Sequence, residues 1–461
     1  MKKFTRNLLI AVLALTLAVT VIAFAACRHD QKYTVTFDSN GGSQVNALTD
    51  VAHGSLIIKP ADPVKLNHTF EGWFKDGRLT NPWKFGSDKV TSDVTLYAKW
   101  SYNQTEGFTM LLNGSQYTIA GLGSVTDANI VIPETYNGLP VTVIADNAFK
   151  DVQSIQTVYI PSNIKTIGVS AFSGCGNLTN VTLPDGLTQI KSELFFYCRK
   201  LNDLDIPSSV TRIDDLAFSG CASLKNVKLP TSLDELGENV FSDCTGLESL
   251  SIENNSKYVS SVNGVPANCI MELKDNEKTL VIGCKNTVIP TSGSPVTVIG
   301  KGAFYGCSEL TGIILPNGIK TIEEGAFNKC ESLASIHIPA SVTDIGERAF
   351  SNCYSLERVT FGEPSQGAQD TGIQTLGREA FSYCYVLSRI HLPGSLTSIG
   401  RGLLHESGGS VELTVSTDLA SNALRNAIEL LGPDEEDPYV TPLAVRCSDT
   451  GDGGVNIYGL A

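Results

Sequence analysis

Positive charge is scarce in this sequence. Its 461 residues hold 34 Lys and Arg against 48 Asp and Glu, which gives a net charge of −14. A protein that binds nucleic acid along its phosphate backbone needs many more cations, so we expect no nucleic-acid partner. Charged residues make up only 18 % of the chain and hydrophobic residues 42 %, which excludes both a disordered acidic polymer and a protein with many membrane spans.

Catalytic and metal-binding motifs are also missing. No P-loop, dinucleotide fingerprint or Gly-x-Ser-x-Gly elbow occurs, and the six His are scattered along the chain. No Cys-x-x-Cys pair is present, and no His lies at metal-ligand spacing from a Cys pair. Residues 449–451 (DTG) match the aspartic-protease tripeptide, but they occur once, without a partner copy. We therefore expect no enzyme activity, no cofactor and no metal site.

Residues 1–26 have the pattern of a secretory signal. Lys2, Lys3 and Arg6 precede an apolar run over residues 8–26. The run ends in small residues directly before Cys27, which resembles a bacterial lipobox. Cleavage there would leave the Cys27 thiol for diacylglycerol, while ordinary secretion and an uncleaved anchor remain alternatives. Each alternative exports the chain to the bacterial surface or beyond, and we expect membrane contact only through this N-terminal end.

Residues 32–101 predict a small β domain. Alternating residues 33–37 precede an Asn-Gly turn, which is typical of a β-hairpin. The only three tryptophans of the chain, Trp73, Trp83 and Trp100, lie in this segment. We expect them to form a compact core, and binding of a ligand by Trp73 and Trp83 is the alternative.

Three motifs of this segment carry a family resemblance. They are residues 34–42 (TVTFDSNGG), 70–74 (FEGWF) and 96–100 (LYAKW). Together they closely resemble the Listeria–Bacteroides repeat, the B-repeat of internalin-type surface proteins. The resemblance implies a β-grasp-like fold that serves as a spacer on a bacterial surface.

A 23-residue repeat organises the rest of the chain. Phenylalanines recur at this interval, with one longer gap and one later irregular step, at Phe149, Phe172, Phe195, Phe218, Phe241, Phe304, Phe327, Phe350 and Phe381. All but the first are followed three positions later by a cysteine, at Cys175, Cys198, Cys221, Cys244, Cys307, Cys330, Cys353 and Cys384. A unit this short cannot bury its own apolar face, so successive units must stack as a solenoid. We expect the phenylalanines to form one continuous column and the cysteines to be buried free thiols.

The repeat itself resembles a known family. Residues 338–353 (IPASVTDIGERAFSNC) look like the BspA-type leucine-rich repeat, and the same pattern recurs over about two thirds of the chain. The predicted fold is thus mainly β: a β-grasp-like domain, an N-terminal cap and first coil at 104–147, and leucine-rich repeats at 148–415. The resemblance also implies an adhesin-like surface protein.

Two insertions break the 23-residue period. The first, near residues 253–290, predicts a hairpin that pairs Leu273 with Leu280 and Cys269 with Cys284. Cys269 and Cys284 then form either a cross-strand disulfide or two separate thiols. The second insertion adds eight residues between Cys353 and Cys384, in a Gly- and Ser-rich loop.

The outward positions of the repeated strand are the best candidate binding surface. At ~4.8 Å per coil, about ten coils give a face roughly 50 Å long, which suits a macromolecule better than a small substrate. The candidate residues on it are Tyr159, Thr182, Asp203, Asp205, Lys228, Ile314, His337, Arg358, Arg389 and His391. We expect a protein of a host or a neighbouring cell as partner. A glycan or cell-wall polymer on the same face is the alternative, a hydrolase with an unrecognised site is a remote one, and each residue could also be merely solvated.

Residues 416–461 leave the repeat. Residues 417–432 have helical spacing, with Thr417 as a possible cap and Gly432 as a stop. We expect this segment to form a C-terminal cap over the last coil.

Overall fold

The computed structural model describes residues 31–65, 68–102, 104–262, 264–274, 277–291, 295–362, 372–393, 395–408, 412–415, 444–450 and 454–460. The signal segment with Cys27, the Gly- and Ser-rich insertion and the predicted helix at 417–432 lie wholly or almost wholly outside these residues. The chain divides into two compact units, Met1–Gln104 and Thr105–Ala461. Over the described ranges, no helix is long and apolar enough to cross a membrane.

The first unit is a four-stranded mixed sheet in the order β2-β1-β4-β3. Its strands are β1 (Lys32–Asp38), β2 (Leu48–Ala52), β3 (His68–Phe74) and β4 (Val94–Tyr102). The two central strands, β1 and β4, run parallel, and the outer strands are antiparallel to them, as expected for a β-grasp-like sheet. Trp73 and Trp83 are buried in the core, and the ring of Phe37 meets Trp73 edge-on at 4.9 Å. Core packing, not ligand binding, thus accounts for both tryptophans.

The second unit begins with a cap over its first coil. The strands are β5 (Thr109–Asn113), β6 (Gln116–Gly121), β7 (Asn129–Val131), β8 (Thr135–Tyr136) and β9 (Leu139–Ile144). β5 and β6 form an antiparallel hairpin, and β6 pairs in parallel with β9 of the first coil. The buried ring of Phe108 meets Phe149 edge-on at 5.9 Å, so it covers the first ring of the repeat.

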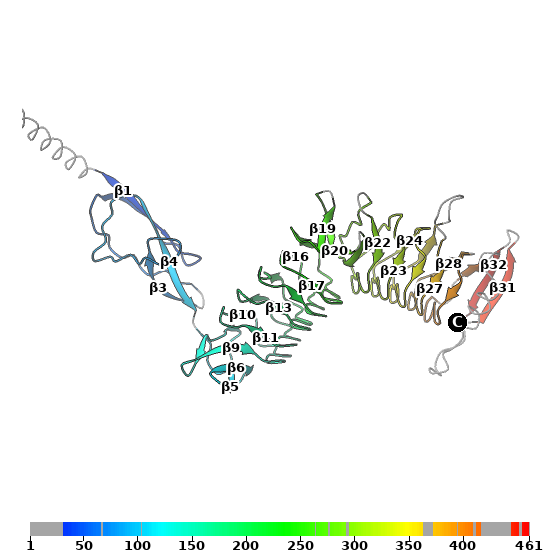
Figure 1. The fold of residues 1–461 in the computed structure, drawn as a ribbon, viewed down its shortest axis with the longest axis horizontal. Helices are drawn as coiled ribbons and strands as arrows, with labels where there is room; N and C mark the ends of the chain where they lie inside the picture. The colour runs from blue at the N-terminus through cyan, green and yellow to red at the C-terminus, as the bar shows by residue number, and fades with distance from the viewer. Residues whose placement is uncertain are drawn as a thin grey trace, which may run out of the picture. The chain divides into compact units, whose positions relative to one another are not determined.

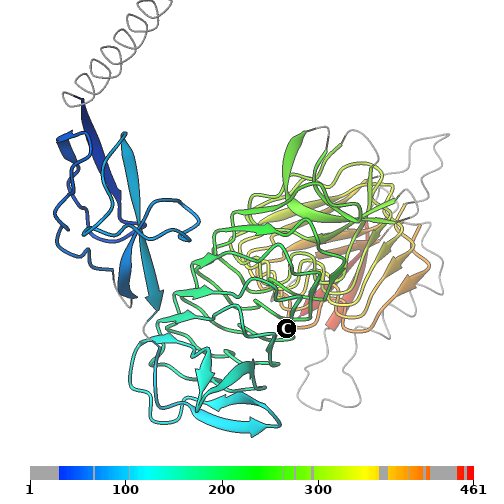
Figure 2. The same ribbon diagram turned by 60° about the vertical axis from the view of Figure 1, so that its left-hand side comes forward.

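Most coils then contribute one strand to each of two parallel ladders, which confirms the predicted solenoid (Figure 1). The first ladder lies, in most coils, just before the proline of the repeat. It holds β10 (Thr157–Tyr159), β12 (Asn180–Thr182), β14 (Asp203–Leu204), β16 (Asn226–Leu229), β18 (Ser249–Ile252), β24 (Ser335–Ile338), β26 (Arg358–Phe361), β28 (Arg389–Leu392) and β30 (Glu412–Val415). The second ladder holds β11 (Thr166–Ile167), β13 (Gln189–Ile190), β15 (Arg212–Ile213), β17 (Glu235–Leu236), β22 (Val296–Ile299), β23 (Thr321–Ile322), β25 (Asp344–Ile345), β27 (Thr375–Leu376) and β29 (Ser398–Ile399). In Figure 2 the later coils, in yellow and orange, lie nearly behind one another.

The rings of the repeated phenylalanines stack inside the coils. From Phe149 to Phe241 the centroid distances are 5.0, 5.6, 5.6 and 5.3 Å, and from Phe304 to Phe381 they are 4.8, 5.0 and 5.2 Å. Each stacked pair stabilises the core by about 0.5–1.5 kcal/mol beyond its burial. The core divides into two clusters, one holding Phe241 and the other Phe304. The prediction of one continuous column is therefore wrong at a single step.

Gly283 explains that break. Its N–H donates to the Ala303 carbonyl at 2.7 Å. In a regular array, the Phe241 N–H would donate to this carbonyl. The Cys307 thiol likewise points to the Gly283 carbonyl, at 3.8 Å, and not to a Phe carbonyl. At the turns the coils still meet directly, since the Asp243 N–H donates to the Tyr305 carbonyl at 3.2 Å. The first insertion thus passes through the interior without ending the solenoid.

That insertion adds three antiparallel strands to the second ladder. They are β19 (Tyr258–Val262), β20 (Val265–Lys274) and β21 (Glu277–Ile282), and β21 pairs in parallel with β22. The predicted hairpin is present, but its register is wrong, because Leu273 pairs with Lys278 and Leu280 with Met271. β20 sends Ile270 into the first core cluster and Met271 into the second, so apolar residues on both faces leave its register weakly specified by pattern.

A hairpin extends the C-terminal end of the first ladder. β32 (Gly454–Leu460) pairs antiparallel with β30 and with β31 (Ala444–Thr450). Sequence analysis assigned residues 416–461 to a C-terminal cap, with a helix only at 417–432, and did not predict these strands. Their alternating pattern is weak, with several glycines nearby.

Candidate functional site

The strand face, the outward side chains of β10 to β28 in the first ladder, is built by simple alternation. In β16, β24 and β28 the residues are exposed, buried, exposed, buried in turn. Inward residues such as Val227 and Ile336 enter the core, because a strand presents successive side chains to opposite sides. Of the predicted face residues, Thr182, Asp203, Asp205, Lys228, Ile314, His337, Arg358, Arg389 and His391 are exposed and Tyr159 is half-buried.

Equivalent residues of neighbouring coils lie in register. Thr157 pairs with Asn180 and Asn180 with Asp203, while Tyr159 pairs with Thr182. Farther along, Arg358 pairs with Arg389. The side chains therefore form rows that cross the strands, as the 23-residue period predicts.

The strand face is not continuous, which corrects the expectation of a single face of about ten coils. Its strands fall into three sheets, with breaks between β14 and β16 and between β18 and β24. Ile314, at 83 % exposure, belongs to no strand in the coil between β18 and β24. The second break coincides with the first insertion, since β20 packs beside β18. The candidate surface is thus divided into an N-terminal half and a C-terminal half.

The two halves differ in charge. Asp203 and Asp205 make the N-terminal half locally acidic, and Lys228 at its end forms an ion pair with Glu253, Nζ to Oε2, at 3.2 Å. The C-terminal half holds Arg358 and Arg389 in register. Imidazoles lie beside them, and His337 Nδ1 is 3.0 Å from the Thr360 hydroxyl. The acidic residues of the strand face thus lie in its N-terminal half and the arginines in its C-terminal half.

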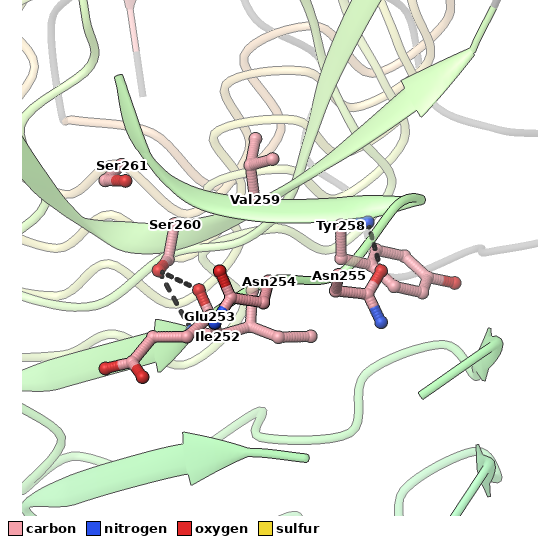
Figure 3. A pocket seen from close by; sticks show the side chains of 8 residues that line it. All are labelled: Ile252, Glu253, Asn254, Asn255, Tyr258, Val259, Ser260 and Ser261. Carbon is pink, nitrogen blue, oxygen red and sulfur yellow. Dashed lines mark hydrogen bonds between the residues drawn. The ribbon is translucent and has the colours of Figure 1, made fainter. Parts of the chain in front are cut away.

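A pocket of about 300 Å³ lies where β18 meets the first insertion (Figure 3). At its base the Ser260 hydroxyl accepts from the Ile252 N–H at 2.9 Å and donates to the Ile252 carbonyl at 3.0 Å. The Asn255 carboxamide oxygen accepts from the N–H groups of Lys257 and Tyr258, both at 2.8 Å. These polar groups are engaged in hydrogen bonds that hold β18 and β19 together. The pocket is therefore explained by the packing of the two strands.

The described cysteines are buried or half-buried free thiols. In seven regular coils the thiol donates to the Phe carbonyl of the preceding coil at 3.0–3.3 Å, as Cys353 does to Phe327. Burial raises the thiol pKa, to about 12 at Cys175 and Cys384. Such thiols are poor nucleophiles and metal ligands, because both roles need the thiolate.

Cys269 and Cys284, the possible disulfide pair, are two free thiols in the structure. Cys269 packs in the second core cluster and Cys284 in the first, where its thiol donates to the Asn268 carbonyl at 3.2 Å. Across the residues with assigned positions, no group of three or more His, Cys, Asp or Glu could hold a metal ion.

Sequence reasoning missed one cluster of aromatic residues on the surface. At the turns of two adjacent coils near the C-terminal end, Tyr385 contacts both Tyr354 and Tyr383. An alignment of the coils position by position would have found it, because Tyr354 and Tyr385 stand where the other coils have small or polar residues.

Comparison with known proteins identifies both units. The BspA type leucine-rich repeat region matches residues 142–263 and 297–427 in six copies, and the Listeria–Bacteroides repeat domain matches residues 33–99. A putative Gly-rich membrane protein and a putative membrane protein of Evansella cellulosilytica are 50 % and 47 % identical over 72 residues, 16 % of this chain. The matches span only 8 % and 11 % of those two proteins.

Solved structures with a similar arrangement come from bacteria. A leucine rich cell surface protein of Faecalibacterium prausnitzii is 24 % identical, with 65 % of this chain and 84 % of that chain covered and a TM-score of 0.43. The pneumococcal vaccine antigen PcpA is 18 % identical, with 72 % and 71 % covered and a TM-score of 0.40. The family matches cover more than half of the sequence with one repeat type. The chain therefore belongs to the BspA-type leucine-rich repeat family and carries an N-terminal Listeria–Bacteroides repeat domain.

Proposed function

We propose that the chain is a non-catalytic binding protein of the bacterial cell surface whose strand face recognises a protein partner. The observation that carries this proposal is the in-register array of exposed, mixed-charge side chains on β10 to β28. Broad surfaces with charged and polar groups suit protein partners, because complementary charge steers encounter and selects the partner.

Surface location is supported by the N-terminal signal pattern and by the family. We propose that Cys27 is the lipid attachment point and that the Listeria–Bacteroides repeat domain acts as a spacer. The test is metabolic labelling of the full chain with a radioactive fatty acid, with Cys27→Ser as the variant that loses the label. A label that survives this substitution contradicts lipid attachment at Cys27.

The binding proposal is tested with a panel of purified extracellular-matrix proteins on a biosensor. One variant combines Asp203→Lys and Asp205→Lys, and a second combines Arg358→Glu and Arg389→Glu. We expect each to weaken association most at low salt, since exposed charges are screened beyond about 8 Å at physiological ionic strength. Stability should change by no more than about 0.5 kcal/mol, because surface substitutions rarely do more.

A control variant reverses two exposed charges away from the strand face, Asp185→Lys and Lys150→Glu. It should bind as the natural chain does. Equal binding by all three variants would place the site elsewhere on the molecule.

A further inference from the structure

Two coils near the C-terminal end carry tyrosines where the repeat does not need them. Tyr354 and Tyr385 follow Cys353 and Cys384 directly in sequence. In the other coils that contain this cysteine, the same position holds Gly176, Arg199, Ala222, Thr245, Ser308 and Glu331. No aromatic side chain is therefore required there for the coil to fold.

Val386 is a second departure from the repeat. It is 51 % exposed, and the equivalent residues are all polar or glycine: Asn177, Lys200, Ser223, Gly246, Glu309, Ser332 and Ser355. Tyr385 itself is 52 % exposed. Apolar surface is thus presented to solvent at positions that the other coils fill with small or polar residues, and such exposed patches mark interaction sites.

The tyrosine patch, made up of Tyr354, Tyr383, Tyr385 and Val386, has a defined geometry. The rings of Tyr354 and Tyr385 stack at 5.2 Å with 13° between their planes. Tyr383 stands perpendicular to Tyr385, at 6.4 Å and 85°, and meets His405 at 5.4 Å and 88°. The rings hold one another in place, so Tyr385 loses little freedom when a ligand binds.

The equivalent position of the next coil carries no side chain that could stack on Tyr385. Tyr354 covers one face of Tyr385, whereas the following coil places Gly408 at the equivalent position. A Cβ on Gly408 would lie 2.5 Å from the Leu387 carbonyl oxygen, so backbone packing excludes a larger residue there. The outcome is a flat aromatic platform at the end of a two-ring stack.

We propose that the tyrosine patch binds a β-linked glycan, with one pyranose ring lying flat on Tyr385. An aromatic face carries partial negative charge and attracts polarised C–H groups. In a pyranose whose hydroxyls are equatorial, the axial C–H groups form such a face and the hydroxyls point to the rim. The phenol groups of the patch can serve as hydrogen-bonding partners for those hydroxyls. The nearby Asn352 carboxamide is already engaged, because its oxygen accepts from the Tyr354 hydroxyl at 3.4 Å and its nitrogen donates to Asn328 and Ser351.

A flat exposed ring fits a sugar better than a peptide side chain. A protein partner usually places its large side chains in fully desolvated pockets, and the patch is an exposed flat surface. Small ligands such as sugars bind against an apolar wall, and the polar groups around it set their orientation. The patch shares no residue with the candidate residues of the strand face. It thus adds a second binding function to the proposed one.

The test uses the full chain and two defined probes, cellohexaose and chitohexaose, at millimolar concentration. Saturation-transfer NMR should show transfer to the sugar C–H protons of at least one probe, and titration calorimetry should give its affinity. Tyr385→Ser should weaken that affinity about tenfold, because the aromatic platform is lost. Serine is chosen because another coil has it at the equivalent position, Ser308. Val386→Ser, which introduces the residue type found at Ser355, should weaken it less.

The matched control is Tyr136→Ser, which removes a tyrosine that is 41 % exposed and has an aromatic neighbour in the N-terminal cap. It should leave the affinity unchanged, and circular dichroism should show all variants folded. Absence of transfer to both sugars, or equal affinity of the Tyr385→Ser variant and the natural chain, would overturn the proposal. Binding of a matrix protein lost through Tyr385→Ser, without sugar binding, would also overturn it and assign the patch to a protein.

Discussion

Gly283 lies at the junction where the first insertion enters the repeat, and Gly283→Ala tests that placement. A Cβ at this residue would lie 2.0 Å from Cε1 of Phe304 and 2.5 Å from its Cδ1 and Cζ. Ordinary contacts of a Cβ begin near 3.4 Å. The ring of Phe304 is fully buried and stacks on Phe327 at 4.8 Å, so it cannot move away freely.

The expected loss follows from two opposing effects. Overpacking of a tight core costs about 1–3 kcal/mol, and the overlap here favours the upper end. Replacing Gly with Ala also reduces the entropy of the unfolded chain, which offsets about 0.4–1 kcal/mol. We expect a net loss of about 2 kcal/mol in the free energy of unfolding.

The control is Gly312→Ala, because a Cβ there meets no atom within 4 Å. It should stabilise the chain by about 0.4–1 kcal/mol. Far-ultraviolet circular dichroism in urea is the assay, since all three tryptophans lie in the first unit and their fluorescence does not report on the solenoid.

Hydrogen exchange locates the effect. Protection should fall at Phe304 and Phe327 and stay unchanged near Phe172, because repeat arrays couple mainly between neighbours. If the Gly283→Ala variant proves as stable as Gly312→Ala, the backbone of Gly283 does not lie against the Phe304 ring and the account of the broken column is wrong.

Two further predictions concern the core. Phe350→Ala removes a fully buried ring that stacks on Phe327 at 5.0 Å and on Phe381 at 5.2 Å. In urea titrations it should lower the free energy of unfolding by about 3–5 kcal/mol. A loss below about 1 kcal/mol would refute the stacked column. The buried thiols should make the protein sensitive to alkali. Burial raises the pKa of the Cys353 thiol in the folded state, and that of the Cys175 thiol to about 12. The stability that these thiols contribute is complete below their unfolded pKa near 9 and is lost as the pH rises above it. Above pH 9, each such thiol lowers the free energy of unfolding by about 1.4 kcal/mol per pH unit. The Cys353→Ala variant should therefore show a smaller fall of the urea midpoint with rising pH. An unchanged slope would show that the pKa of this thiol is the same in the folded and unfolded chain.

The periodic parts of the fold were predictable residue by residue. A constant 23-residue interval specifies that Asn180 lies beside Asp203, as the strand register has it. Arg358 and Arg389 are paired in the same way, because the inserted loop between them leaves the frame of the coil intact. Burial of the Phe and Cys series follows from the same interval, because equivalent side chains of stacked units must point the same way.

The insertion was predictable only as a hairpin. Its register depends on packing between two core clusters, and the strand β20 is apolar on both faces, so the pattern offers no preferred pairing. The tyrosine patch was missed for a different reason: Tyr354 and Tyr385 hold equivalent positions of adjacent coils, which only a position-by-position alignment of the coils brings out.

The sequence by itself determined the two domain types, the repeat length and which side of each strand faces solvent, since these depend on local patterning and on a strict period. Only the tertiary structure decided how the first insertion fits into the array. Gly283 enters the interior beside Phe304, and the strand face divides into two halves of different charge. The physical reason is that the repeat period specifies the contacts of a regular coil but not those of an inserted segment. The position of the insertion therefore depends on how it packs against the surrounding coils.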